Sequence, residues 1–148
     1  EGVMQVSTKG RYGLRLMAAL AAQYGKGVVK VDKLSESEEI TINYIHVLMN
    51  SLKTAGLVRA IRGPNGGYEL AMPPDEMTAY DVVTALEGRI EPVECVHTPS
   101  MCKAVGQCMT RDVWCDLAKA YEEVLKKYTL RMLLEGWLKQ HGGVDYSI

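Results

Sequence analysis

The spacing of hydrophobic residues along the chain predicts a mainly helical protein. In most of the predicted helices apolar side chains recur every three or four residues, the period of a helix with one buried face. Residues that favour helix ends stand at their borders, with Ser7 before the first, Asp32 before the second and Gly56 after the third. The predicted helices cover residues 8–23, 33–39, 43–54, 78–87, 110–128 and 129–140.

Three of these helices carry more specific expectations. Thr78 is placed to cap residues 78–87, with Asp81 completing a variant of the capping box. Apolar residues in 110–128 alternate at spacings of three and four, which is typical of a helix that packs against a partner helix. The expected inner face of residues 43–54 consists of Tyr44, Val47, Leu48 and Leu52.

Two short runs of strand-forming residues flank a glycine-rich tip between residues 57 and 70. The tip contains Asn65-Gly66, the pair that most strongly favours a tight β-hairpin. Two helices, a short turn between them and a following hairpin have the order of a winged helix-turn-helix. The expected fold is mainly α with a small β-hairpin wing. Its expected units are a DNA-binding domain (4–75), a linker helix with a cysteine-rich loop (76–109), and a long dimerisation helix with a C-terminal helix (110–148).

Composition argues against two broad classes of protein. The chain has 148 residues, of which 47% are hydrophobic and 24% charged, values typical of globular proteins rather than disordered ones. No apolar run is long enough to span a bilayer, and the start at Glu1 lacks the features of a signal peptide. We therefore expect a cytoplasmic protein with no membrane partner, in a compartment where thiols stay reduced.

The net charge of −1 averages two unlike halves. Residues 1–75 carry nine Lys and Arg against seven Asp and Glu, whereas residues 76–148 carry eight against eleven. The halves are thus +2 and −3, and the positive half holds the predicted helix-turn-helix. This asymmetry weakly favours contact with nucleic acid there.

The outer face of residues 43–54 and the wing supply candidates for binding double-stranded DNA. Asn offers paired hydrogen bonds to adenine, while Thr, His and Lys reach bases or phosphates. Arg62 beside the wing glycines is a candidate for the minor groove, and Lys9 and Arg11 are candidates for phosphates. For any one of these residues alone, a solvated surface is the simpler interpretation. The predicted DNA-binding residues are Lys9, Arg11, Thr41, Asn43, Tyr44, His46, Arg59, Arg62, Gly63 and Asn65, with Asn50 and Lys53 on the same helix face.

Four segments resemble a family of bacterial winged-helix regulators. They are Ser7-Thr8-Lys9-Gly10-Arg11-Tyr12, Ile42-Asn43-Tyr44, Leu52-Lys53-Thr54-Ala55-Gly56-Leu57-Val58 and, most specifically, Arg62-Gly63-Pro64-Asn65-Gly66-Gly67-Tyr68. From Met4 to about Trp137 the chain is similar to the IscR-like iron–sulfur cluster regulators, whose relatives include NsrR and CymR. The resemblance implies a homodimer that binds a near-palindromic operator, with the long helix at 111–127 exchanged across the two-fold axis.

Four cysteines, Cys95, Cys102, Cys108 and Cys115, cluster in the second half of the chain. Thiolates are soft ligands that select iron–sulfur clusters, zinc or copper(I). Because the chain has no paired C-x-x-C motif, a zinc site is less expected than an iron–sulfur cluster, but it is not excluded. Cys115 lies within a predicted helix and is the least expected ligand, since a lone helical cysteine usually acts as a small buried hydrophobe.

The resemblance assigns the cluster to three of these thiols. In cluster-binding members three loop cysteines are ligands, and they correspond here to Cys95, Cys102 and Cys108, with a 2Fe-2S cluster preferred and 4Fe-4S as the alternative. A histidine follows three residues after the last cysteine in IscR-type members, whereas this chain has Arg111 there. The fourth ligand is therefore open among His97, Cys115 and a residue from the partner subunit's first helix. The implied function is a regulator that senses iron–sulfur status and controls cluster-biogenesis genes.

Other functions remain open at this point. A cluster-free repressor of the CymR kind would respond to cysteine oxidation or to a partner protein, and a nitric-oxide sensor would use the same fold. An enzyme with Cys108 or Cys115 as nucleophile lacks the required His and Asp constellation and any phosphate-binding loop, so we expect no enzymatic activity.

Overall fold

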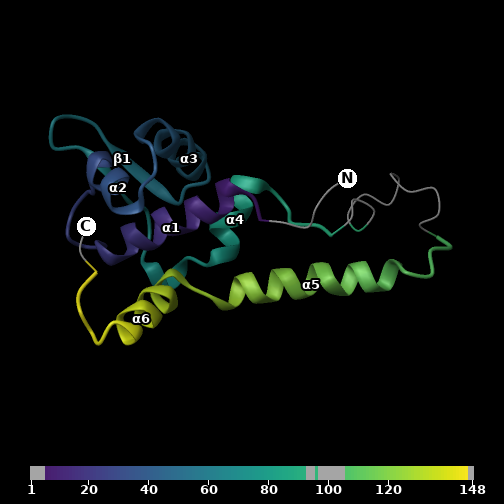
Figure 1. The fold of residues 1–148 in the computed structure, drawn as a ribbon. Coiled ribbons are helices and arrows are strands. Elements are labelled where there is room, and N and C mark those ends of the chain that lie inside the picture. Colours follow the sequence, from purple (N-terminus) through teal and green to yellow (C-terminus); the bar gives the residue numbers. More distant parts are fainter. Residues whose placement is uncertain (1–5, 93–95, 97–105, 147–148) are drawn as a thin grey trace.

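The computed structural model describes residues 6–92, 96 and 106–146 (Figure 1). The described residues form six α-helices, a two-stranded antiparallel hairpin and a short 3₁₀ helix, which confirms the expected fold class. No helix among them is long and apolar enough to cross a membrane. The elements are α1 (Thr8–Ala22), α2 (Val31–Glu38), α3 (Ile42–Thr54), β1 (Val58–Ile61), β2 (Gly67–Leu70), η1 (Pro74–Glu76), α4 (Ala79–Glu87), α5 (Arg111–Lys127) and α6 (Leu130–Gln140).

The hydrophobic core lies mainly between α1, α2, α3, the hairpin and α4, with α1 running through its centre (Figure 1). Leu16 of α1, Leu34 of α2 and Ile45 of α3 are fully buried. Helix α1 approaches α4 so closely that a Cβ built on Gly13 would lie 2.0 Å from Leu86 Cδ1. The α1–α4 contact therefore depends on a missing side chain in α1.

Two of the predicted helix starts differ from the structure in their capping. Ser7 stands at the N-cap of α1, but its hydroxyl donates to the carboxylate of Glu87 instead of capping the helix. Helix α2 begins at Val31, which puts Asp32 in the first turn, where a negative charge favours the helix N-terminus. The capping box of Thr78 and Asp81 is confirmed, with both reciprocal hydrogen bonds present.

The predicted inner face of α3 was partly wrong. Its buried residues are Ile45, Leu48, Met49 and Leu52, whereas Val47 is 53% exposed. A helix advances about 100° per residue, so the stripe centred on Leu48 and Leu52 takes in Ile45 and Met49 and turns Val47 outward. Tyr44 lies between the two faces and is half-buried.

The predicted hairpin is confirmed, and its tip is longer than the two-residue turn that Asn-Gly most often forms. Strand pairing ends at Ile61 opposite Gly67, so residues 62–66 form the connection. The N–H of Gly66 donates to the carbonyl of Gly63 at 3.0 Å, which closes a turn with Pro64 and Asn65 at its centre. Proline suits the second position of such a turn because its φ is already fixed there, and this outweighs the Asn-Gly preference.

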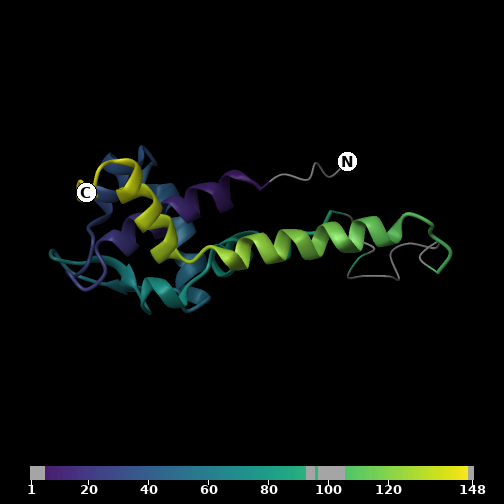
Figure 2. The same ribbon diagram turned by 90° about the horizontal axis from the view of Figure 1, so that it is seen from below.

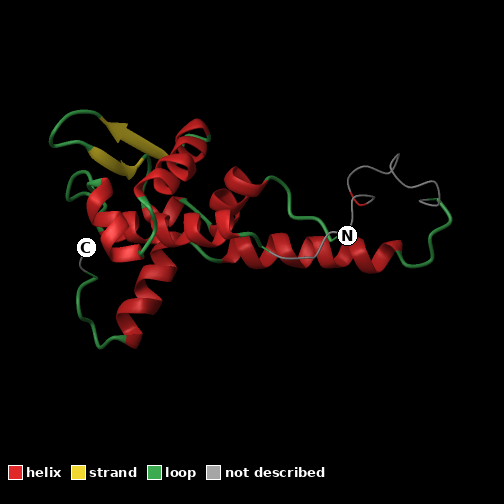
Figure 3. Cartoon of the chain, turned by 45° about the horizontal axis from the view of Figure 1, so that its top comes forward, coloured by secondary structure: helices red, strands yellow, loops and turns green. Residues whose placement is uncertain are grey.

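The two strands of the wing lie at one end of the helical body (Figure 3), and a backbone bridge joins them to the segment before α2. The N–H of Val29 donates to the carbonyl of Tyr68 at 2.8 Å, and the N–H of Tyr68 donates to that of Val29 at 2.9 Å. A Cβ on Gly67 would lie 2.1 Å from the Val29 carbonyl oxygen. The bridge thus requires glycine at position 67, and it holds the wing against the body.

Helix α5 extends away from the body as a long arm (Figures 1 and 2). Of its 17 residues only Ala118 is buried. The arm is anchored where α5 ends, because the N–H of Ala79 donates to the carbonyl of Tyr128 and the N–H of Leu130 to that of Met77. Helix α6 follows at the body and packs across α1 (Figure 2).

Candidate nucleic-acid interface and cysteine region

The turn between α2 and α3 directs the N-terminus of α3 outward. Glu39 takes the left-handed conformation (φ 55°), which reverses the chain, and Ile40 is buried as its anchor. Thr41 follows as the N-cap of α3, and its hydroxyl oxygen accepts a hydrogen bond from the Tyr44 N–H at 3.4 Å. Thr41 and Asn43 are both exposed at this end, where helix N–H groups and the helix dipole attract phosphate.

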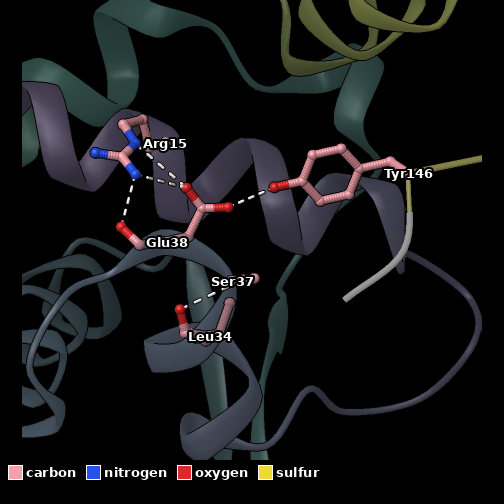
Figure 4. A network of polar contacts seen from close by, with 5 residues as sticks. All are labelled: Arg15, Leu34, Ser37, Glu38 and Tyr146. Atoms are coloured by element: carbon pink, nitrogen blue, oxygen red, sulfur yellow. Dashed lines mark hydrogen bonds and ion pairs between the residues drawn. The ribbon is translucent and has the colours of Figure 1, made fainter. Parts of the chain in front are cut away.

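A buried carboxylate holds this turn in place (Figure 4). Glu38, the last residue of α2, is 6% exposed. Arg15 of α1 donates to its side chain at 3.2 Å and to its backbone carbonyl at 2.6 Å. The hydroxyl of Tyr146, near the end of the chain, donates to the other carboxylate oxygen. Partial burial and the neighbouring Glu38 raise the pKa of Tyr146 to about 12, so the hydroxyl stays protonated.

The outward face of α3 is a continuous stripe of exposed side chains. Asn43, His46, Val47 and Asn50 follow one another at helical spacing, and all four are exposed. Three of them offer hydrogen bonds to base edges, and Val47 offers the apolar contact that suits a thymine methyl group. Sequence reasoning missed Val47, although its spacing of four from Asn43 and three from Asn50 already placed it on this face.

His46 links α3 to the wing. Its Nδ1 lies 2.7 Å from the hydroxyl oxygen of Tyr68 on β2, and the two ring centroids are 5.9 Å apart. Tyr68 itself is 8% exposed, so its ring belongs to the core while its hydroxyl reaches α3. The positions of α3 and of the wing are coupled through this pair.

A groove of about 430 Å³ lies between α3, the wing and the start of α2. Three cationic side chains line it, Lys30, Lys53 and Arg62, with a single carboxylate, Asp32. A concave surface with an excess of positive charge is suited to the phosphate backbone of a nucleic acid. Lys30 was not among the predicted residues, because only the fold brings the N-cap of α2 beside the wing.

The remaining wing candidates lie on the surface. Arg62, Gly63 and Asn65 are all exposed at the tip. Arg59 is exposed too, but it forms an ion pair with Glu69 on the opposite strand at 3.3 Å. An exposed pair of this kind contributes little to stability, so a phosphate competes with Glu69 at small cost.

The candidates in and beside α1 are less well placed. Lys9 and Arg11 are exposed in the first turn, but the backbone N–H groups of Ser7 and Gly10 already donate to the carboxylate of Glu87. This end of α1 is therefore closed to anions by a carboxylate of the same chain. Tyr44 packs edge-on against Tyr12, with ring centroids 6.1 Å apart, and so helps to join α1 to α3.

The cysteine region is described only in part. Cys95, Cys102 and His97 lie outside the described residues. Among the residues that are described, no group of three or more His, Cys, Asp or Glu is arranged to hold a metal. Cys108 is partly exposed, and hydrogen bonds from Thr110 together with the nearby Arg111 lower the pKa of its thiol. A thiol of this kind is a better ligand and a better nucleophile at neutral pH.

Arg111 connects the cysteine loop to the start of α5. It donates from Nη2 to the carbonyl of Val96 at 3.4 Å, and its Nε is buried without a partner among the described residues. Val96, Arg111 and Cys115 line one hollow on this side of α5. A guanidinium is permanently protonated and has no free lone pair, so Arg111 is not a metal ligand.

The comparisons with known proteins agree on one family. Residues 6–136 match the family model Rrf2, an iron-dependent transcriptional regulator. The chain is 38% identical over 130 residues to the transcriptional regulator CymR of Bacillus subtilis (88% of this chain, 89% of CymR). It is 32% identical over 131 residues to the transcriptional regulator IscR of Aliivibrio salmonicida (88% and 77%).

Solved structures give the same result. The structure of B. subtilis CymR, the global cysteine regulator, superposes with a TM-score of 0.72 at 37% identity, covering 87% of this chain and 95% of CymR. The IscR of T. potens superposes with a TM-score of 0.73 at 33% identity, covering 89% and 87%. These relatives are transcriptional regulators and not enzymes, as the sequence led us to expect. The chain belongs to the Rrf2 family of transcriptional regulators.

Proposed function

We propose that this regulator is a cytoplasmic homodimer that reads a near-palindromic operator with α3 and the wing, and that an iron–sulfur cluster controls its affinity for DNA. The observation that carries the DNA-binding part is the exposed stripe of α3 beside a groove lined by Lys30, Lys53 and Arg62. Base edges would contact the stripe, and phosphates would contact the cations. Because two subunits related by a two-fold axis present two such surfaces, the operator is expected to be near-palindromic.

Helix α5 supplies the surface for dimerisation. Val113, Val124 and Tyr128 are between 40% and 58% exposed on an arm that has one buried residue. Leu117 lies four residues after Val113 and seven before Val124, and Tyr128 lies four after Val124, so the four side chains share one face of the helix. An apolar face of this length on an isolated arm is expected to pack against the same helix of a second subunit. In this proposal residues 110–148 form the dimerisation unit, residues 4–75 form the DNA-binding unit, and residues 76–109 connect the two.

The proposed cluster ligands are Cys95, Cys102 and Cys108. The donor chemistry fits, since Cys108 has a lowered thiol pKa and thiolates are the preferred ligands of iron–sulfur clusters. A 2Fe-2S cluster would supply a redox-sensitive and oxygen-labile centre. The fourth ligand comes from a residue other than Arg111, because that side chain is engaged with Val96 and has no lone pair to donate.

Control of DNA binding would pass through the start of α5. Cys108 precedes the first residue of α5 by three positions, and Thr110 is the N-cap. Ligation at Cys108 would hold this helix start in one position, and release of the ligand would free it. Since the α5 arms join the two DNA-reading units, this change would alter their spacing. We propose that the regulated genes serve cluster biogenesis.

A cluster-free thiol switch is the second candidate. Two features favour it. Hydrogen bonds from Thr110 lower the pKa of the Cys108 thiol. The chain is also similar to CymR, for which an oxidised structure from Staphylococcus aureus superposes with a TM-score of 0.69 at 35% identity. In this case oxidation of Cys108 would change the start of α5 without any metal.

An anaerobic visible absorption spectrum with iron and sulfide analysis separates the two candidates. The wild-type protein is expected to show an iron–sulfur band that Cys102→Ala abolishes and that Cys115→Ala retains. A protein that stays colourless after anaerobic reconstitution would overturn the cluster proposal and favour the thiol switch. Zinc without iron in the wild type, lost in Cys102→Ala, would assign the cysteines to a structural metal.

A further inference from the structure

We propose that Tyr68 fixes the proton arrangement of His46, so that His46 presents an N–H donor to the DNA and selects a hydrogen-bond acceptor there. The inference rests on the proposed function, because it assumes that α3 reads the operator. It adds a positioning residue in the wing and the chemical class of the base edge that His46 contacts.

In the pair of His46 and Tyr68, the position of the tyrosine is fixed by its surroundings. Tyr68 is held by its backbone bridge to Val29 and by its pairing with Ala60 on β1, and the residue is 8% exposed. The hydroxyl therefore stands at a fixed place beside α3, 2.7 Å from Nδ1 of His46. This distance is typical of a strong hydrogen bond involving a hydroxyl group.

Two proton arrangements satisfy this distance. Either the Tyr68 hydroxyl donates to Nδ1, or a protonated Nδ1 donates to the Tyr68 oxygen. In the second arrangement the phenol proton needs another acceptor, and the described residues offer it none. Burial raises the pKa of Tyr68, so the hydroxyl keeps its proton. The first arrangement satisfies both groups, and it places the imidazole proton on Nε2.

Nε2 lies across the ring from Nδ1, and His46 is exposed in the groove between α3 and the wing. The group offered to DNA is therefore a hydrogen-bond donor. Its partners in the major groove are guanine N7 and O6, adenine N7 and thymine O4, whereas the N4 amino group of cytosine is itself a donor. Without Tyr68 the imidazole would exchange between its two tautomers. Its exposed nitrogen could then pair with a base atom that accepts a hydrogen bond or with one that donates it.

The nitrogen shifts of the histidine rings test the proton arrangement without DNA. A long-range ¹H–¹⁵N spectrum in mildly alkaline solution, assigned with His46→Ala, is expected to show the Nε2–H tautomer for His46 in the wild type. Tyr68→Phe should give a mixture of tautomers, and Tyr24→Phe, at an exposed tyrosine after α1, should leave the signal unchanged. An Nδ1–H tautomer in the wild type would overturn the inference.

Selection from a pool of random DNA duplexes tests the consequence for recognition. The wild-type dimer is expected to enrich a consensus motif. Both His46→Ala and Tyr68→Phe should lose the preference at the same single base pair of each half-site. At that pair the preference should fall by about three- to tenfold, the effect of one hydrogen bond. A merely structural role for Tyr68 would instead weaken binding to all sequences equally.

The outcomes distinguish the inference from the function on which it rests. An unchanged motif in Tyr68→Phe would overturn the inference and leave the proposed DNA reading intact. A wild-type protein that enriches no sequence would overturn both. In the double variant Tyr68→Phe/His46→Ala, the base preference should match that of His46→Ala alone, because Tyr68 acts only through His46.

Discussion

At the residue scale, neighbouring apolar side chains of α3 have opposite environments. Ile45 is fully buried and Val47 is 53% exposed. We expect Ile45→Ala to lower the free energy of unfolding by about 2–5 kcal/mol, because it leaves a cavity in the core. Val47→Ala should change it by less than about 0.5 kcal/mol and should weaken operator binding instead. Urea unfolding and DNA titration of both variants measure this; a large stability loss in Val47→Ala would contradict the observed orientation.

The same pair shows what sequence reasoning could and could not assign to single residues. Helical periodicity located α3 and most of its outward stripe, because burial follows a period that is visible in the sequence. It misplaced Val47, because a hydrophobic residue at a protein surface looks the same in a sequence as one in the core. The contacts of Lys30 with the groove and of Tyr68 with His46 join residues far apart in the chain, so no local pattern carried them.

Tyr146 makes a residue-scale contact whose strength depends on pH. Its folded-state pKa is raised above the usual value of 10.0 to about 12, so its contribution to stability is complete below pH 10 and is lost as pH rises through 12. We expect Tyr146→Phe to lower the free energy of unfolding by about 1 kcal/mol at neutral pH. Above pH 10 the difference should shrink, as measured by denaturant unfolding across this range.

Tyr24→Phe provides the matched control for that measurement. Tyr24 is 41% exposed, and no side-chain partner is assigned to it within the described part of the chain. A difference between Tyr146→Phe and wild type that stays constant from neutral pH to above pH 10 would show that the hydroxyl does not interact with Glu38.

At the element scale, the wing depends on backbone packing that glycine makes possible. A Cβ at position 67 would lie 2.1 Å from the Val29 carbonyl oxygen, which belongs to the backbone and has little freedom to move. We expect Gly67→Ala to break the Val29–Tyr68 bridge, to lower the free energy of unfolding by about 1–3 kcal/mol and to weaken DNA binding. Thermal unfolding and DNA titration measure the two effects.

Gly136 in α6 is the matched control for the wing. A Cβ there meets no atom within 4 Å, and the residue lies inside a helix. Gly136→Ala should therefore raise the free energy of unfolding by about 0.5–1 kcal/mol, because alanine loses less backbone freedom on folding. If both glycine substitutions proved equally harmless, the close approach of the wing to residue 29 would be absent in solution.

Element boundaries were predicted well where the signal is local. The capping box of Thr78 and the C-terminal Gly56 of α3 depend on residues within one turn, and both are confirmed. The wing hairpin was predicted, but the residues at the centre of its turn were not, because Pro64-Asn65 competes with Asn65-Gly66 for the same tip. Val29 lies about forty residues upstream of Tyr68, so the bridge between them depends on tertiary packing and not on a local sequence signal.

At the scale of the whole molecule, the exposed face of α5 predicts the oligomeric state. Val113 and Val124 are 58% and 56% exposed, so a lone subunit would leave a row of apolar side chains in water. We expect Val124→Glu to shift the protein from dimer to monomer, because a charge would be buried in the helix pair. Sedimentation velocity across a concentration series measures this, with Glu123→Gln as the control on the adjacent position.

The dimer prediction also separates assembly from folding. Val124 touches little of its own subunit, so Val124→Glu should leave helicity at low temperature unchanged while operator affinity falls by at least tenfold, because each monomer binds a single half-site. Binding to an isolated half-site should stay as it is in the wild type. A variant that remains dimeric would place the subunit interface on another surface, and α5 would then be free to contact a different protein.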